Sequence, residues 1–227
     1  MIFILDVRGL HKTYGKKRVL EEVSFQLERG SVTGLIGVNG SGKSTLLRIL
    51  AGAEKPTSGA FLIQGQVMKR ARSAARFVAY VPQENALIEE LTVLDNLKLW
   101  YADALVPLSQ ALDRGLLKEM GIRDFLKTRV KNCSGGMKKR LAIACSLAHE
   151  APILLLDEPG ASLDLLMKKE LTDAILLYAR QGGTVLWASH DPEELGACSK
   201  GLLLKRGRIE PLEGIPSSTE LLQRLSQ

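Results

Sequence analysis

Nine consecutive residues, Gly37 to Thr45, carry the residue types needed to bind a phosphate chain. They fit the pattern G-x-x-x-x-G-K-[ST], in which glycines let backbone N–H groups approach phosphate oxygens. Lys43 supplies a positive charge for the β- and γ-phosphates, and the Ser44 hydroxyl is placed to hold Mg²⁺. The stretch therefore predicts a nucleoside-triphosphate site. Its expected ligand-binding residues are Asn39, Gly40, Ser41, Gly42, Lys43, Ser44 and Thr45.

The residues on either side of this loop predict the elements that position it. Residues 31–36 are typical of a short buried strand, and residues 46–51 of the opening of a helix. A strand, a glycine turn and a helix start direct backbone N–H groups and the positive end of the helix dipole toward one point. The alternative is a Gly/Ser-rich turn that happens to precede a helix, which four fixed residues in register argue against.

Two adjacent acids, Asp157 and Glu158, follow the apolar run 153–156. A fully apolar run predicts the centre of a parallel sheet, and ligands bind at the carboxyl edge of such a sheet. We expect Asp157 to face Mg²⁺ and Glu158 to polarise the attacking water. The alternative is an acidic strand end that simply reaches solvent.

A second glycine-rich helix start lies at Ser134-Gly135-Gly136. Ser134 is a good N-cap, and the two glycines leave the first N–H groups of the helix exposed. The stretch therefore predicts a second anion site, far in sequence from the first.

The remaining pattern predicts an α/β fold in one domain. Apolar pieces at 3–7, 19–20 and 23–27 indicate an N-terminal antiparallel β meander ahead of a mainly parallel central sheet. Residues 88–133 have a helical period, with Val93, Leu97, Trp100 and Ala104 on one face, and lack a strand signal. We expect them to form a helical lobe inserted between core segments 1–87 and 134–227. Other elements are expected at 60–63, 77–81, 163–180 (helix), 184–188 and 202–209, with a capped helix after Ser217.

Composition narrows the class of protein. The net charge is +6, but its longest basic clusters, 16–18 and 138–140, are not interleaved with aromatic residues, so nucleic-acid binding is not favoured. No run of about 18 apolar residues could span a bilayer, and the N-terminus lacks a basic leader, so an intracellular protein is expected. The three cysteines are widely spaced and are interpreted as reduced structural thiols.

Taken together, the motifs resemble the nucleotide-binding subunit of an ATP-binding cassette (ABC) transporter over essentially the full length and in the family's order. The resemblance implies ATP and Mg²⁺ as cofactors. It implies that Tyr14 stacks on adenine, that Gln83 reaches Mg²⁺ and the attacking water, and that His190 contacts the γ-phosphate. The implied catalytic residues are Lys43, Gln83, Glu158 and His190, and the implied metal ligands are Ser44, Gln83 and Asp157.

The resemblance also implies partners. Ser134, Gly135 and Gly136 match the family's signature sequence, which closes over the ATP of a second ABC ATPase subunit, identical or not. Asp164, in Ser162-Leu163-Asp164, matches the dimer-contact loop. A separate transmembrane permease subunit is implied, with this chain cytoplasmic and peripheral on the inner face of the membrane. Residues Leu87, Ile88 and Leu91 are expected to contribute to docking, although core packing would explain them equally well.

The sequence departs from the family pattern at Cys133 and Met137, where leucine and glutamine are usual. Met137 followed by Lys138-Lys139-Arg140-Leu141 resembles bacterial exporters with separately encoded membrane subunits. The alternative function is a soluble ABC ATPase acting on ribosomes or nucleic acid, but such proteins usually carry two cassettes or a long coiled-coil insertion. A catalytically silent cassette is opposed by the intact Lys43, Asp157, Glu158 and His190.

Overall fold

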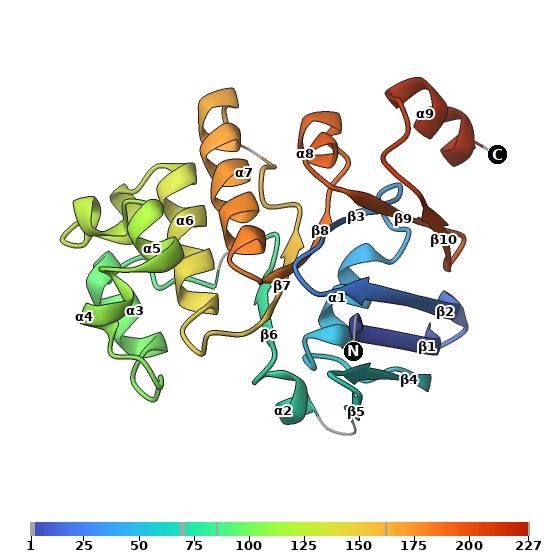
Figure 1. The fold of residues 1–227 in the computed structure, drawn as a ribbon, viewed down its shortest axis with the longest axis horizontal. Coiled ribbons are helices and arrows are strands. Elements are labelled where there is room, and N and C mark those ends of the chain that lie inside the picture. Colours follow the sequence, from blue (N-terminus) through green and yellow to red (C-terminus); the bar gives the residue numbers. More distant parts are fainter. Residues whose placement is uncertain (1–2, 69–70, 85, 162, 227) are drawn as a thin grey trace.

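The computed structural model describes residues 3–68, 71–84, 86–161 and 163–226 (Figure 1). In this part of the chain, one sheet has the strand order β2-β1-β4-β5 and a second has the order β10-β9-β3-β8-β7-β6. The strands of the first sheet pair antiparallel, whereas β9, β3, β8, β7 and β6 are parallel with β10 as an antiparallel edge. The predicted fold class, a phosphate-loop α/β core with an antiparallel N-terminal sheet, is confirmed.

The parallel sheet is built on three short strands that are buried along their whole length. These are β3 (Val32–Ile36), β7 (Ile153–Asp157) and β8 (Thr184–Ala188). Their register aligns Leu35 and Asp157 with Ala188, so the strands end at the same edge. The start of the phosphate loop and the acidic pair therefore lie together at this edge. The flanking strands are β6 (Val78–Val81), β9 (Lys200–Lys205) and β10 (Arg208–Leu212).

The antiparallel sheet contains two long strands, β1 (Phe3–Tyr14) and β2 (Lys17–Glu28), joined with β4 (Ser58–Ile63) and β5 (Gln66–Val67). The pieces predicted at 19–20 and 23–27 thus belong to one strand. Glu22 between them adopts φ 56°, and the β1–β2 register shifts nearby, so the strand absorbs an irregularity without ending. Glu21 N donates to Gly207 O (2.7 Å), which connects this sheet to the β9–β10 turn.

Two apolar clusters divide the interior. One lies between the two sheets and encloses helix α1 (Lys43–Leu50), which carries the phosphate loop at its N-terminus (Figure 1). The other lies on the opposite face of the parallel sheet, beneath α6 (Gly135–Ser146) and α7 (Leu165–Arg180). The sheet edge with its acids is therefore supported from both faces.

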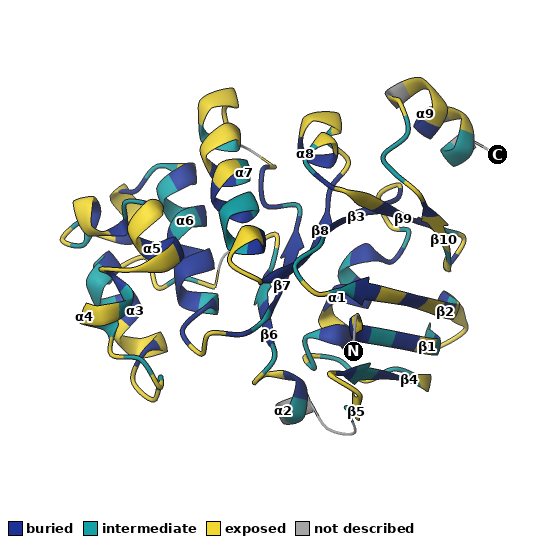
Figure 2. Ribbon diagram, in the orientation of Figure 1, coloured by how far each residue is buried: buried dark blue, intermediate teal, exposed yellow. Residues whose placement is uncertain are grey.

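Residues 88–133 form short helices, and no strand occurs among the described residues of this stretch. Figure 2 shows their buried sides facing α6 and their exposed sides facing outward. Of the four residues predicted to share one helical face, Val93 and Leu97 are fully buried and Ala104 is partly buried against the same cluster, whereas Trp100 is 43% exposed. The helix ends at Trp100, so helical spacing does not continue, and Tyr101 turns inward to donate to Ala144 O (3.3 Å). The elements are α3 (Val93–Trp100), α4 (Leu108–Ala111), α5 (Gly115–Glu119), η1 (Ile122–Phe125) and η2 (Val130–Asn132).

Helix α7 begins at Leu165 rather than at the predicted residue 163, because Asp164 is its N-cap: Asp164 Oδ1 accepts from Met167 N (2.9 Å). Short helices α2 (Ala71–Ala74) and α8 (Pro192–Gly196) lie elsewhere on the parallel-sheet core. Of the described helices, none combines the length and apolar character needed to cross a membrane.

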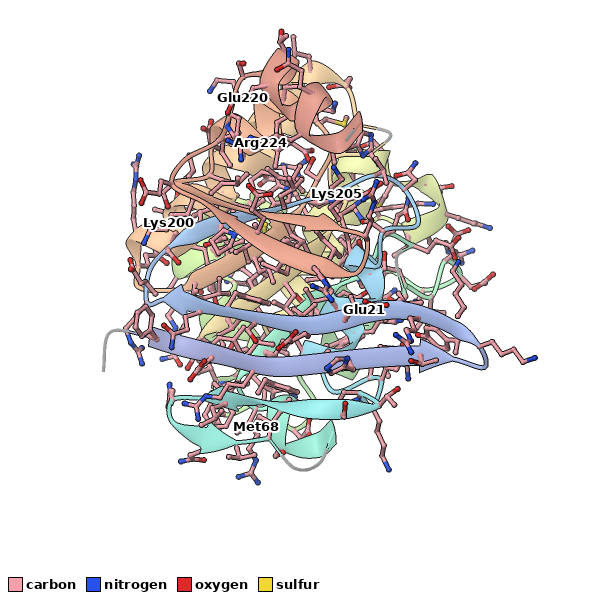
Figure 3. All side chains as sticks on the ribbon, turned by 90° about the vertical axis from the view of Figure 1, so that its right-hand side faces the viewer. Glu21, Met68, Lys200, Lys205, Glu220 and Arg224 are labelled. Carbon is pink, nitrogen blue, oxygen red and sulfur yellow. The ribbon has the colours of Figure 1, made fainter. Side chains whose placement is uncertain are left out.

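The C-terminal helix α9 (Ser218–Ser226) packs on the β9–β10 hairpin. Ser217 Oγ accepts from Glu220 N (3.3 Å), as the predicted cap requires. Lys205 Nζ donates to Arg224 O (2.6 Å), and Figure 3 shows Arg224 and Glu220 on the side of the molecule above Lys205.

The three cysteines are buried and not disulfide-bonded. Burial raises the pKa of Cys145 and Cys198 to about 12, which keeps both as neutral thiols. This fits the predicted structural role.

Candidate nucleotide-binding and hydrolysis site

The phosphate loop leads from β3 into α1, and two of its glycines are required by geometry. Gly42 is the N-cap of α1 with φ 109°, a conformation that L side chains rarely adopt. A Cβ on Gly37 would lie 2.6 Å from Leu204 O and 2.6 Å from Ser41 Oγ. Because Gly42 has no side chain to cap the helix, the first N–H groups of α1 remain available to an anion.

Lys43 lies inside this loop with only 5% of its side chain exposed. Its Nζ donates to Gly37 O (2.8 Å) and lies 3.4 Å from Glu158 Oε1. The cation predicted to contact phosphates is therefore already paired with the carboxylate predicted to activate water.

The predicted metal-binding pair is in direct contact. Ser44 Oγ donates to Asp157 Oδ1 (3.1 Å), and Asp157 is 2% exposed. Tyr80 OH donates to the other carboxylate oxygen, Oδ2 (3.2 Å). Burial, and then the Asp157 charge, raises the pKa of Tyr80. Tyr80 lies one element away on β6, and no local motif marks it, so the sequence did not reveal this contact.

The donor set fits magnesium. A hydroxyl and a carboxylate are hard oxygen ligands, and Mg²⁺ in proteins usually takes one or two carboxylates together with substrate phosphates and water. Within the described ranges, no cluster of three or more His, Cys, Asp or Glu could hold a metal by itself. Ser44 and Asp157 would hold Mg²⁺ together with the nucleotide, and the ion would supply charge neutralisation at the phosphates.

Glu158 has a left-handed backbone (φ 47°), which for a residue other than glycine costs about 1–3 kcal/mol and is common at functional sites. Its N–H donates to Ala188 O (2.9 Å), which holds this conformation. Its side chain is 12% exposed, and Oε1 lies 3.4 Å from Lys43 Nζ and 3.5 Å from His190 Nδ1. His190 itself is 63% exposed. The structure thus gathers three predicted catalytic side chains around one oxygen atom.

A cavity of about 400 Å³ opens beside the phosphate loop. It is lined by residues from widely separated parts of the chain, so that the predicted Tyr14 and Gln83 lie around the same space as Lys43 and Glu158. Lys17 and Val19, which the sequence did not single out, complete one wall. The lining residues are Tyr14, Lys17, Val19, Asn39, Gly40, Gly42, Lys43, Ser44, Thr45, Gln83 and Glu158.

Tyr14 is held by a charged group that sequence reasoning missed. Its hydroxyl donates to Glu54, which also pairs with Lys12 (2.9 Å) and Arg48 (3.2 Å). Burial raises the pKa of Glu54, but the hydrogen bonds from Tyr14 and Lys12 outweigh it and leave the pKa below its ordinary value. Lys12 Nζ also lies 4.7 Å from the ring centroid of Tyr14. The ring is therefore oriented through its hydroxyl and covered by a cation.

Ser134, Gly135, Gly136 and Asp164 are not among the described residues that line this cavity. Ser134 caps α6, with its Oγ accepting from Met137 N (3.2 Å), and Figure 1 shows α6 and α1 on opposite sides of β7. A Cβ on Gly136 would lie 2.6 Å from Met167 Sδ, so α6 and the start of α7 approach closely. Ser162, predicted in the dimer-contact loop, lies outside the described residues.

The predicted docking residues divide by burial. Ile88 is 45% exposed, whereas Leu87 packs against the apolar cluster beneath α6 and Leu91 is half-buried. Asn96 Oδ1 accepts from Ile88 N (2.9 Å), which fixes Ile88 beside helix α3, where Leu99 and Trp100 are also exposed.

Lys43 is held against Glu158 by a buried strand, a glycine loop and a helix, and Ser44 is bonded to Asp157. These features define a phosphate-loop nucleoside triphosphatase. The family model described as "ABC transporter" matches residues 20–161. The chain belongs to this family: it is an ABC nucleotide-binding subunit, an ATP hydrolase.

Three similar proteins illustrate the range of the family. The chain is 33% identical over 225 residues to a probable sulfate/thiosulfate import ATP-binding protein of Chlorella vulgaris, covering 94% of both chains. It is 34% identical over 208 residues to the Nod factor export ATP-binding protein I of Mesorhizobium japonicum, covering 90% of this chain and 61% of that protein. A dimeric, post-hydrolysis structure of the cassette MJ0796 with ADP and Pi matches with a TM-score of 0.80 at 26% identity, covering 94% of this chain and 99% of that one.

Proposed function

We propose that this subunit drives export through a separate transmembrane permease, on the cytoplasmic face of the membrane, by ATP-dependent head-to-tail pairing and Mg²⁺-dependent ATP hydrolysis. The observation that carries the proposal is the cavity in which Tyr14, the phosphate loop, Gln83 and Glu158 meet. Its parts come from distant segments, and each has the chemistry that one portion of a magnesium nucleotide requires.

Each site residue has a role that its surroundings support. Tyr14 offers an aromatic face to the base, and Lys43 exchanges Glu158 for phosphate oxygens when nucleotide enters. Glu158 then accepts the proton of the attacking water as general base, with His190 beside the same carboxylate oxygen. Gln83, an exposed residue of the cavity wall, orients that water.

The second anion site has no nucleotide of its own within one chain. Ser134, Gly135 and Gly136 lie at the N-terminus of α6, and Asp164 lies at the N-terminus of α7 beside it. We assign these residues to the ATP bound by a second ABC subunit, so that two nucleotides are enclosed between two chains. The dimeric relative with ADP and Pi supports this arrangement.

We place the docking surface for the permease on Ile88, Leu99 and Trp100. These apolar side chains are 45%, 57% and 43% exposed. Ile88 lies in the segment that follows Gln83, and its N–H donates to Asn96 on α3, the helix that carries Leu99 and Trp100. Contact with a membrane subunit would cover them and place that subunit next to the residue that orients water.

The direction of transport rests on the sequence from Met137 to Leu141, which resembles the exporter branch. Relatives include both import and export ATP-binding proteins, so overall similarity does not decide it.

The proposal is tested by purifying the tagged chain from detergent-solubilised membranes of its own host. We expect an integral membrane protein to co-purify and to be lost in an Ile88→Glu/Trp100→Glu variant. Val67→Glu serves as a control at an exposed apolar residue of β5, away from this surface and from the proposed contact with the second subunit. Recovery with ribosomes or nucleic acid in place of a membrane protein would contradict the proposal.

A further inference from the structure

Lys139 is a lysine of helix α6 that the chemistry described so far does not use. It is 5% exposed, in contrast to Lys138 beside it, whose side chain is 25% exposed and pairs with Glu89. Buried lysines are rare in proteins unless they are paired. Its position in the interior therefore requires a partner.

The partners of Lys139 are two backbone carbonyls. Its Nζ donates to Pro82 O (3.4 Å) and to Gln83 O (3.3 Å). Strand β6 ends at Val81, so both carbonyls belong to the loop that leads away from the sheet. The ammonium is thus a tether between α6 and the loop that carries Gln83.

Burying an ammonium is costly, since structural relaxation relieves its desolvation penalty only in part. Burial lowers the pKa of Lys139, and the charges of Asp157 and Glu194 oppose this shift. The charge is stabilised only while acceptors remain around it. The same interaction that satisfies Lys139 therefore restrains the backbone of residues 82 and 83.

We infer that Lys139 is a positioning residue for hydrolysis: it holds the Pro82–Gln83 backbone so that the Gln83 side chain faces the nucleotide cavity. The inference rests on the role proposed above for Gln83. It also joins two parts of the site, because α6 carries Ser134, Gly135 and Gly136 at its N-terminus. The helix that contacts the second subunit's nucleotide and the loop that orients water in its own site are then mechanically connected.

The test compares ATP turnover and nucleotide affinity in Lys139→Met, whose unbranched side chain is one heavy atom shorter and has no donors. Misplacing a catalytic group by about 1 Å costs up to about 100-fold in rate, so we expect kcat to fall about 10- to 100-fold. KM for ATP and the Kd for nucleotide should stay within about twofold, because Lys139 does not line the cavity. Lys139→Arg, which keeps donors for two carbonyls, should restore most of the rate.

Lys138→Met is the matched control, with the same change one residue earlier. Its ion pair with Glu89 is partly exposed, and solvent screening weakens such pairs, so turnover should stay within about twofold. Thermal unfolding checks that each variant is folded. If Lys139→Met does not fold, Lys139→Leu, another apolar helix former without a donor, takes its place with the same expected loss of rate at unchanged affinity.

Combination with Gln83→Ala separates this inference from the proposed function. If Gln83→Ala lowers kcat and Lys139→Met has no further effect in that background, both are supported. If Gln83→Ala lowers kcat but Lys139→Met alone leaves it unchanged, or if the two losses multiply, the inference is overturned while the role of Gln83 stands. If Gln83→Ala leaves kcat unchanged, the role proposed for Gln83 is overturned, and the inference about Lys139 falls with it.

Discussion

Replacement of Glu158 by glutamine isolates the proton-accepting step from nucleotide binding. The carboxylate oxygen Oε1 lies 3.4 Å from Lys43 Nζ and 3.5 Å from His190 Nδ1, and the side chain is 12% exposed. Glutamine has nearly the same shape and can accept a hydrogen bond, but it cannot take a proton from water. The left-handed backbone at this position (φ 47°) strains either residue equally.

The magnitude follows from what is removed. Loss of a general base lowers turnover by about 10² to 10⁴, which corresponds to about 3 to 5 kcal/mol of transition-state stabilisation. Nucleotide binding should be retained, with Kd changed by less than about threefold. The reason is that Lys43 loses a competing carboxylate but keeps its hydrogen bond to Gly37 O (2.8 Å). The variant should therefore bind ATP and hold it uncleaved.

Steady-state phosphate release measures turnover, and equilibrium titration with a fluorescent ATP analogue measures binding. Glu150→Gln is the matched control, since Glu150 is 60% exposed in a surface pair with Arg114, and it should turn over at the wild-type rate. Turnover of Glu158→Gln within about threefold of the wild type would refute the assignment of the base. Loss of ATP binding would refute the separation of binding from chemistry.

Three further predictions concern neighbouring side chains. Lys43→Ala removes a charge-assisted contact to the phosphates, so calorimetry should show ATP affinity reduced at least about 10-fold; unchanged affinity would count against its role. Tyr80→Phe removes the hydroxyl bonded to Asp157 (3.2 Å). The Mg²⁺ concentration that supports half-maximal ATPase activity should therefore shift about two- to tenfold. An unshifted Mg²⁺ titration would exclude a part for Tyr80 in the metal site. Hydrogen bonds outweigh burial and hold the pKa of Glu54 below its ordinary value. The charged carboxylate therefore stabilises the folded state at pH values above the ordinary pKa, and this stabilisation is lost as pH falls through the folded-state pKa. The melting temperatures of wild type and Glu54→Gln should therefore differ near neutral pH and converge in acid; a difference that is the same at all pH values would be inconsistent with this linkage.

The sequence predicted those parts of the site that depend on contiguous residues. The phosphate loop is one motif, and its conformation follows from glycines at fixed positions, as at Gly37 and Gly42. Asp157 could be placed because a fully apolar strand ends in it, and parallel strands bring their carboxyl ends to one edge. In both cases the residue and the element that positions it are adjacent in the chain.

Contacts between distant segments could not be predicted in this way. Tyr80 reaches Asp157 because β6 pairs with β7, and Lys139 reaches residue 83 because α6 packs over β6. Neither contact leaves a local pattern, since each depends on how elements far apart in the chain are packed. The burial of Lys139 in particular runs against the usual exposure of lysine.

Two corrections have local causes. Residues Val93, Leu97, Trp100 and Ala104 were predicted to share one helical face, but α3 ends at Trp100 and Ala104 lies beyond it. The start of α7 was predicted at residue 163, although Asp164 is one of the residue types preferred as an N-cap. A stricter use of capping preferences would have placed this boundary from the sequence alone.

In the proposed dimer, one chain's phosphate loop and another chain's Ser134-Gly135-Gly136 enclose the same nucleotide. Light scattering on Glu158→Gln, with and without Mg²⁺ and ATP, tests this arrangement most directly, with Gly135→Asp added to place a carboxylate at the second anion site. We expect a monomer without nucleotide, a dimer with ATP, and a monomer that still binds ATP when Gly135→Asp is present. A dimer that forms equally well with Gly135→Asp, or no dimer at saturating ATP, would contradict it.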